Sequence, residues 1–393
     1  MAANPSIQLG TDGNWAIKEG NLLAYKKDGN RFFNKEFDFS RGSLATFVGE
    51  NGLIQESATN TPRIDFTNNA TGHLLLEPQR TNLITYSEDF TQWIAGSNTS
   101  LTFVSDIVAP DGSLGVYRLT LPATSDTYLS SNAFTGQNPL ALSIYAKSVN
   151  TNNDFNFYDG NSPSPTKTAS NEWQRFDYVG NGNQLIIVNS GDTFETDIYI
   201  WGAQAEARSY PTSYIPTSGS TVTRSAEVCN NSGSEQDFND SEGVLYAEIA
   251  ALVDNGTPRR LSISDGTNND RVLIGYSSSN RLQYVVSDGG SVVVNKLITV
   301  DNITAQNKTA FKYKLNDCTI WINGFEIDTD TVATMPSGLN TLNFDQANGT
   351  EDFYGKTKEL AVFKRALTDL ELESLTSWDS FIEMATELEY TIE

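Results

Sequence analysis

The sequence is poor in the residues from which many catalytic and metal sites are built. It has one histidine, His73, and two cysteines, Cys229 and Cys318. A multi-histidine metal site, a disulfide framework and a cysteine-rich zinc site are therefore excluded. A Ser-His-Asp or Cys-His arrangement would have to use His73, and its place before three leucines is typical of a strand edge. We expect a histidine without a catalytic role and two buried thiols.

Basic residues and long apolar runs are also scarce. The chain has 26 Lys and Arg against 49 Asp and Glu, a formal charge of -23. The charges are scattered, which predicts a soluble surface that repels nucleic acid and anionic membranes. The N-terminus lacks the basic and apolar regions of a secretory signal, and no window approaches the roughly 18 apolar residues of a membrane span. We expect neither feature, and we expect synthesis in a cytosol.

Short alternating apolar and polar segments fill most of the chain. Helical periodicity interrupts them only near the C-terminus, which favours an all-β fold of antiparallel sandwiches over a parallel α/β sheet. The predicted parts are an irregular β region for assembly or attachment (1–85), a first sandwich or jelly roll (86–223), a second sandwich (224–377) and a short helical tail (378–393).

The stretch His73–Phe90 is predicted to join the N-terminal region to the first sandwich. Leu74–Leu76 has the pattern of a buried strand, and Pro78 ends it because proline lacks the N–H that a sheet needs. The rest of the stretch opens the first sandwich. We expect a structural joint, with ligand-binding residues elsewhere.

Local signals are clearest near the C-terminus. Asn323-Gly324 supplies the two positive φ angles of a type I′ hairpin turn. Thr368 with Glu371 forms a capping box, which predicts the start of a helix, and Ser380 with Glu383 forms a second one.

Several longer strings resemble bacteriophage structural proteins. They are FDFSRGSLATFVGENGLIQESATNTPRIDF, HLLLEPQRTNLITYSEDF and IYIWGAQAEARSYPTSYIPTSGSTVTRSAE. In that family such segments frame a jelly roll similar to carbohydrate-binding modules. The later strings SEGVLYAEI, TIWINGFEI and KELAVFKRALTDLELESL resemble a concanavalin A-like or laminin-G-like sandwich.

The resemblance implies a virion appendage protein of the tail-fibre or head-fibre type. It implies host adhesion through surface polysaccharide without enzymatic activity, other virion proteins as partners, a location in the virion and a homotrimer. Two alternatives remain open. One is a purely structural protein that decorates the capsid or tail, and the other is a polysaccharide-degrading glycosidase or lyase.

Glu326, Asp328 and Asp330 are the acidic residues that bear on the enzymatic alternative. Residues two apart on a strand share a face about 7 Å apart, which lies between the separations of retaining and inverting glycosidases. A solvated strand face is the favoured interpretation. Loss of activity in an Asp328→Asn variant would restore the enzymatic one.

Glycan binding needs aromatic rings for the C–H faces of sugars and polar groups for their hydroxyls. The candidate rings are Trp93, Tyr128, Tyr158 and Trp173 in the first sandwich, and Tyr276 and Tyr284 in the second. Trp201 and Trp321 lie in alternating segments and are predicted to be core residues. No cofactor is expected beyond a possible structural Ca²⁺, with Asp265, Asn268 and Asp270 as its candidate ligands, close to Asn269.

Overall fold

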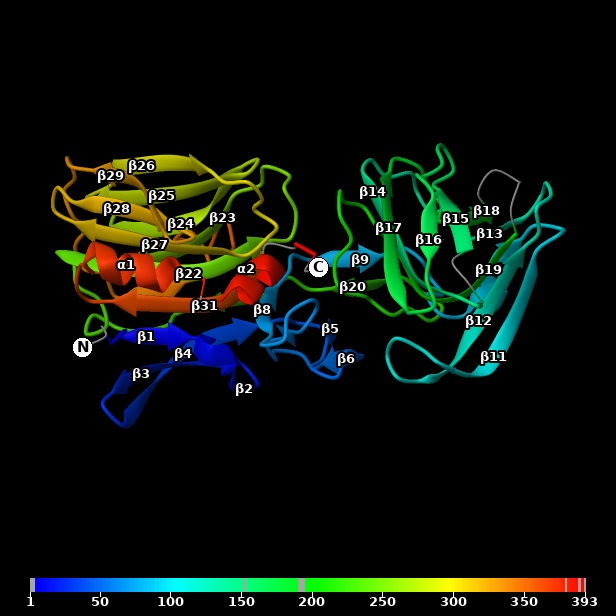
Figure 1. Cartoon of the computed structure of the whole chain (residues 1–393), viewed down its shortest axis with the longest axis horizontal. Helices are drawn as coiled ribbons and strands as arrows, with labels where there is room; N and C mark the ends of the chain where they lie inside the picture. The colour runs from blue at the N-terminus through cyan, green and yellow to red at the C-terminus, as the bar shows by residue number, and fades with distance from the viewer. Residues whose placement is uncertain (1–3, 151–152, 190–194, 379, 388–389, 392–393) are drawn as a thin grey trace. The chain divides into compact units, whose positions relative to one another are not determined.

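The computed structural model describes residues 4–150, 153–189, 195–378, 380–387 and 390–391. The chain divides into two compact units. Unit 1 comprises residues 1–42, 58–78 and 226–393, and unit 2 comprises residues 43–57 and 79–225. Antiparallel sheets make up both units, so the all-β prediction is confirmed (Figure 1).

Unit 1 contains a large antiparallel sheet with strands from both ends of the chain. Its order is β21 (Val228–Asn230), β4 (Arg31–Ser40), β3 (Asn21–Asp28), β1 (Ile7–Leu9), β31 (Gly355–Phe363), β22 (Glu242–Ala251), β27 (Asn307–Lys314), β28 (Cys318–Ile322) and β29 (Phe325–Asp330). Three further strands extend it, namely β2 (Ile17–Lys18) beside β3, β8 (His73–Leu76) beside β31, and β7 (Ile64–Asp65) beside β8.

A second sheet completes the sandwich of unit 1. It contains, in order, β26 (Ser291–Thr299), β25 (Arg281–Asp288), β24 (Arg271–Ser278), β23 (Arg259–Ser264) and β30 (Thr341–Asn343). Alternate residues of both sheets form one apolar core, in which Leu245, Ile274 and Phe311 are fully buried. This alternation follows from the two-residue period of a strand.

The outer face of the large sheet is covered by α1 (Asp369–Thr376). Leu372 packs there with Trp321, whose predicted core position is confirmed. The capping box of Thr368 and Glu371 begins α1, as predicted. The predicted turn is also confirmed, since Asn323-Gly324 joins β28 to β29 with two positive φ angles.

The short helix α2 (Phe381–Glu387) follows, and the backbone N–H of Glu383 donates to Ser380 at 3.0 Å. Residues 379, 388–389 and 392–393 of the predicted tail lie outside the described residues. A 3-10 turn, η1 (Thr11–Gly13), follows β1. In the described part of the chain, no helix combines the length and apolar character that a membrane crossing needs.

The predicted N-terminal region does not form a part of its own. Strands β1 to β4 and β8 belong to the large sheet of unit 1, whereas residues 43–57 belong to unit 2. The pairing of β1 with β31 explains the difference, because Ile7 lies opposite Val362. Such a pairing leaves no local sign in the sequence.

Unit 2 is a sandwich of two five-stranded antiparallel sheets. One contains β10 (Ile94–Ala95), β13 (Tyr128–Ser130), β18 (Ile186–Asn189), β15 (Asn153–Tyr158) and β16 (Lys167–Ala169). The other contains β11 (Ser100–Val108), β12 (Leu114–Leu121), β19 (Thr196–Glu206), β14 (Leu140–Ser148) and β17 (Gln174–Gly180). Unit 2 also contains β9 (Arg80–Asn82) paired with β20 (Val222–Arg224), and the 3-10 turn η2 (Phe90–Gln92).

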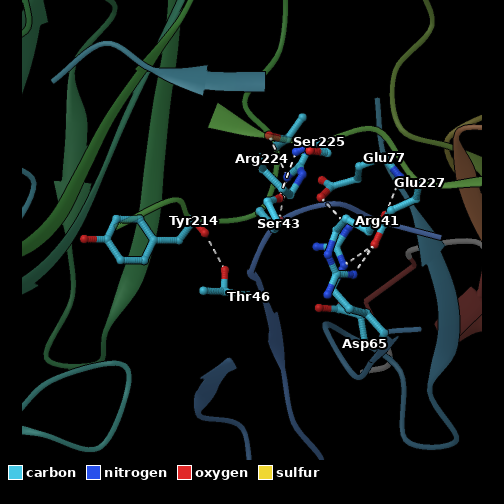
Figure 2. Close-up of polar contacts among 12 residues, drawn as sticks. Arg41, Ser43, Thr46, Asp65, Glu77, Tyr214, Arg224, Ser225 and Glu227 are labelled. Carbon is cyan, nitrogen blue, oxygen red and sulfur yellow. Dashed lines mark hydrogen bonds and ion pairs between the residues drawn. The ribbon is translucent and has the colours of Figure 1, made fainter. Parts of the chain in front are cut away.

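The hairpin of β5 (Ala45–Val48) and β6 (Ile54–Ser57) is the N-terminal contribution to unit 2. Thr46 donates from its hydroxyl to the carbonyl of Tyr214, and the N–H of Ser225 donates to Ser43 at 2.9 Å (Figure 2). Ile54 packs with Tyr214 in an apolar cluster. The hairpin is thereby fixed to the last segment of unit 2.

A buried ion cluster holds together three distant segments of unit 1. Glu227 accepts from Arg41 at 2.7 Å and from Nε of Arg63 at 2.8 Å, while Arg63 also pairs with Glu77 at 2.9 Å. Figure 2 shows Arg41, Glu77 and Glu227 turned toward one another. Since these side chains are at most 4% exposed, each charge depends on its partners.

Candidate functional site

The sheet of β11, β12, β19, β14 and β17 in unit 2 has aromatic side chains on both faces. Ile200 points into the core, whereas its neighbour Trp201 belongs to a second cluster on the opposite face with Val116 and Tyr214. Two open clefts adjoin this second cluster. We call them the acidic cleft and the Trp173 cleft.

The acidic cleft has a volume of about 500 Å³. Its described lining residues are Tyr86, Glu88, Asp89, Phe103, Ser113, Leu114, Gly115, Val116, Tyr117, Trp201, Pro216, Thr217 and Ser218. Backbone pairing brings two of its walls together, because Tyr86 bridges Ser218 and the N–H of Ser87 donates to the carbonyl of Thr217 at 3.2 Å. The cleft is therefore built on strands and paired backbone.

Phe103 presents the most exposed ring of this cleft. Its side chain is 57% exposed, and its ring lies edge-on to that of Tyr117 with centroids 5.4 Å apart. Gly115 makes this position possible, because a Cβ there would lie 2.5 Å from the Phe103 ring. The φ angle of Gly115 is also +110°, which side chains disfavour. A glycine thus keeps the ring at the mouth of the cleft.

Glu88 lies beside the buried Tyr214. The Tyr214 hydroxyl donates to Oε1 of Glu88 at 2.8 Å. Although the residue as a whole is exposed, loss of hydration around its carboxylate raises the pKa of Glu88, and the nearby charge of Asp111 adds to this. The hydrogen bond from Tyr214 opposes the shift. Glu88 therefore holds a proton more readily than a free glutamate does.

Asp89 has the opposite electrostatic environment. Its Oδ1 accepts from the Thr91 hydroxyl at 2.6 Å and from the Tyr117 hydroxyl at 3.3 Å. Hydrogen bonds from Thr91 are the main cause of a lowered Asp89 pKa. Asp89 therefore keeps its negative charge more firmly than a free aspartate does.

Thr217 contributes a polar atom that the protein leaves unsatisfied. The residue is only 7% exposed, and among the described atoms its Oγ1 has no hydrogen-bond partner. Buried hydroxyls are rarely left without a partner, because an unmade hydrogen bond costs about 1–3 kcal/mol. Thr217 therefore brings to the cleft wall a buried hydroxyl that has no partner among the described atoms.

The Trp173 cleft has a volume of about 440 Å³, and the predicted ligand residue Trp173 lines it. Its indole N–H already donates to the carbonyl of Val108 at 2.8 Å. Tyr145 lies in the same wall, and Lys147 and Asp106 carry opposite charges there. Trp173 is half-buried, so part of its ring can meet a ligand.

Three of the other predicted aromatic residues are buried. Tyr276 and Tyr284 are 1% and 0% exposed in the core of unit 1, and their hydroxyls bond to Ile249 and Thr309. Trp93 is 8% exposed in the core of unit 2. Rings in these positions cannot stack on a sugar from solvent, which corrects the prediction for them.

Tyr128 and Tyr158 are half-buried on β13 and β15 of unit 2. Neither residue lines the acidic cleft or the Trp173 cleft. Of the predicted aromatic residues, only Trp173 thus lines one of these two clefts.

The three predicted Ca²⁺ ligands lie in one loop between β23 and β24, where each bonds to a different protein group. Asp265 accepts from Thr267, Asn268 from Arg271, and Asp270 from the N–H of Ser337 at 2.8 Å. Within the described ranges, no group of three or more His, Cys, Asp or Glu side chains is arranged to hold a metal ion. A Ca²⁺ site in this loop stays a prediction.

The acidic residues of β29 are engaged by the protein. Asp328 and Asp330 both pair with Lys296 at 3.3 Å, and Glu326 accepts from Thr329. All three positions lie on the strand at one edge of the large sheet. This arrangement agrees with the predicted solvated strand face.

The sequence analysis missed the acidic cleft, although Tyr86, Glu88 and Asp89 belong to the stretch His73–Phe90. We predicted a structural joint there, and the structure confirms one, because unit 1 gives way to unit 2 between residues 78 and 79. Nothing in the spacing distinguished Glu88 from the other carboxylates. A tyrosine close to two adjacent carboxylates was the only available signal.

No family model and no curated protein matches the sequence. Among solved structures, a CBM40 module of a Ruminococcus gnavus IT-sialidase bound to α2,3 sialyllactose covers 38% of this chain and 94% of its own, with 17% identity and a TM-score of 0.32. Domain 4 of a Geobacillus stearothermophilus GH43 arabinanase in complex with arabinotriose covers 39% of this chain and 73% of its own, with 13% identity and a TM-score of 0.31.

A longer match is the sialidase of Trypanosoma rangeli. It covers 91% of this chain and 65% of its own, with 10% identity and a TM-score of 0.30. This match, which spans most of the chain, is to an enzyme. This finding corrects two predictions, namely the bacteriophage appendage function and the absence of enzymatic activity.

Proposed function

We propose that unit 2 binds a glycan in the acidic cleft. The observation that carries the proposal is the combination, in one cleft, of the exposed Phe103 ring, two carboxylates and the unpartnered hydroxyl of Thr217. A sugar presents a C–H face and hydroxyl edges, so it needs both kinds of group close together.

The pose follows from the positions of these groups. The C–H face of a sugar ring packs on Phe103 at the mouth, and its hydroxyls donate to Glu88 and Asp89. The Thr217 hydroxyl, which has no partner among the described atoms, bonds to a sugar hydroxyl that reaches the cleft wall. Glu88 has accepting capacity to spare, because an ionised carboxylate has about four lone-pair sites.

A glycan array with the full chain, followed by calorimetry on the best ligand, tests this function. We expect Phe103→Ala to weaken binding by about 1–2 kcal/mol, because the variant loses the buried ring face. We expect Thr217→Val to weaken it by about 1 kcal/mol through one lost hydrogen bond.

Phe32→Ala is the matched control, since Phe32 is a 64% exposed phenylalanine of unit 1 that does not line the cleft. It should leave affinity unchanged. The proposal fails if no glycan binds, or if Phe103→Ala binds as the wild type does.

A second candidate function is cleavage of the bound glycan. It is favoured by one observation, that the environments of Glu88 and Asp89 shift their pKa values in opposite directions. In this reaction Glu88 gives its proton to the glycosidic oxygen as the bond to the anomeric carbon breaks. Water adds to that carbon and gives a proton to Asp89. The products are two shorter sugars with hydroxyl ends.

Reducing-end release from the glycan that binds tests the second function. We expect Glu88→Gln to lower the release rate about 100-fold or more while binding persists, because the amide cannot donate the proton. Asp328→Asn is the control, because this carboxylate lies on β29 of unit 1 and pairs with Lys296 of β26. Release that Glu88→Gln leaves unchanged would exclude this role for Glu88.

The homotrimer, the virion partners and the virion location followed from the bacteriophage resemblance alone. They stay predictions of that resemblance.

A further inference from the structure

The charge in the acidic cleft has one sign. Among the described residues that line it, the charged side chains are Glu88 and Asp89, and none is a lysine or arginine. Asp111 acts electrostatically on Glu88 and adds a third negative charge nearby. The Trp173 cleft differs, since Lys147 and Asp106 both line it.

The aromatic rings of the acidic cleft also favour a positively charged ligand. Phe103 and Tyr117 lie edge to face, and Tyr86 lines the same space. The face of an aromatic ring carries negative potential and attracts an ammonium group within about 6 Å. A carboxylate ligand would meet both the rings and the two carboxylates without a cation to pair with.

One carboxylate oxygen of Glu88 accepts a hydrogen bond from Tyr214, so the other oxygen can accept one from a ligand. Thr217 adds a buried hydroxyl that has no partner among the described atoms and that can accept as well as donate. An ammonium group has three donors and no acceptor, so these acceptors and the ring faces match it.

We propose that the acidic cleft selects glycans that carry free amino groups, such as glucosamine oligomers, over acetylated or acidic glycans. The inference rests on the proposed glycan-binding function and names its ligand class. An N-acetylated sugar keeps the ring contacts but loses the charge. A uronic acid sugar brings a like charge toward Glu88 and Asp89, which is unfavourable.

Calorimetry on the full chain with three oligomers of equal length tests the inference. The oligomers are glucosamine, N-acetylglucosamine and galacturonic acid, at a pH below the pKa of the amines at which Glu88 is ionised. We expect the glucosamine oligomer to bind about tenfold more tightly than the acetylated one, and the galacturonic acid oligomer to bind most weakly. The preference should shrink as salt rises, because the cleft is open to solvent.

Glu88→Gln and Asp89→Asn identify the source of the preference. Both variants keep the size of the side chain, and asparagine still caps η2. We expect each to weaken binding of the glucosamine oligomer several-fold more than binding of the acetylated oligomer, so that the preference falls in both variants. Asp106→Asn is the matched control, because it removes a carboxylate from unit 2 outside the acidic cleft.

The possible results distinguish a failure of the amino-sugar preference from a failure of glycan binding itself. Equal binding of the glucosamine and acetylated oligomers, with loss in Phe103→Ala, overturns the inference and leaves glycan binding intact. A preference that Asp106→Asn reduces as much as Asp89→Asn is a general charge effect and also overturns it. If neither these oligomers nor any glycan on the array binds, the proposed function fails as well.

Discussion

His73 is the only histidine of the chain, and its imidazole is 1% exposed. Its Nε2 lies 3.6 Å from Oδ1 of Asp65. Burial lowers the pKa of His73 to about 3, and the charges of Lys356 and Lys358 add to this, while Asp65 opposes it. The folded protein therefore keeps the imidazole neutral, and no catalytic role follows from its position.

The lowered pKa of His73 predicts a specific pH dependence of stability. Below about pH 6.5 the unfolded chain binds a proton that the folded state refuses, so stability falls as the pH drops toward the folded pKa of about 3. At about pH 5 this effect lowers the free energy of unfolding by about 2 kcal/mol. Urea unfolding of the wild type and of His73→Gln at about pH 7 and pH 5 measures it.

The difference between the two proteins isolates the histidine from the many carboxylates. We expect the free energy of unfolding of the wild type to fall by about 2 kcal/mol more than that of His73→Gln. Parallel losses in the two proteins would contradict this account of His73.

At the scale of elements, the buried carboxylate of Glu227 holds together segments that are far apart in the sequence. Arg41 follows β4, Glu77 follows β8 and Glu227 precedes β21, so one carboxylate links three strands of the large sheet. The N–H of Glu77 also donates to Glu227 at 2.8 Å. Removing this charge leaves two buried guanidinium groups with too few acceptors.

We expect Glu227→Gln to lower the free energy of unfolding by about 3–5 kcal/mol, because it breaks a buried ion cluster on one side. Glu242→Gln is the control, since the pair of Glu242 with Lys314 is 3.8 Å long and partly exposed. It should cost at most about 1 kcal/mol. Denaturant unfolding measures both, and equal costs would refute the role of the cluster.

At the scale of the whole molecule, local signals predicted elements and missed their assembly. The predicted buried strand Leu74–Leu76 lies in β8, and the turn at Asn323-Gly324 and the start of α1 are as expected. Each depends on neighbours in sequence, such as strand alternation or a cap.

The assembly depends on contacts between distant residues. Thr46 bonds to Tyr214, 168 residues later, so nothing local assigns β5 and β6 to unit 2. The acidic cleft likewise collects Glu88, Phe103 and Thr217 from three separate segments. The sequence shows which residues these are, but no local pattern in it predicts that they lie in one cleft.

The most direct test of glycan binding in the acidic cleft is a crystal structure of the full chain with the best oligosaccharide from the array. The account predicts a sugar ring against Phe103, with hydroxyl or amino groups within hydrogen-bond distance of Glu88 and Thr217. A sugar bound in the Trp173 cleft or on unit 1, with the acidic cleft holding only solvent, would contradict it.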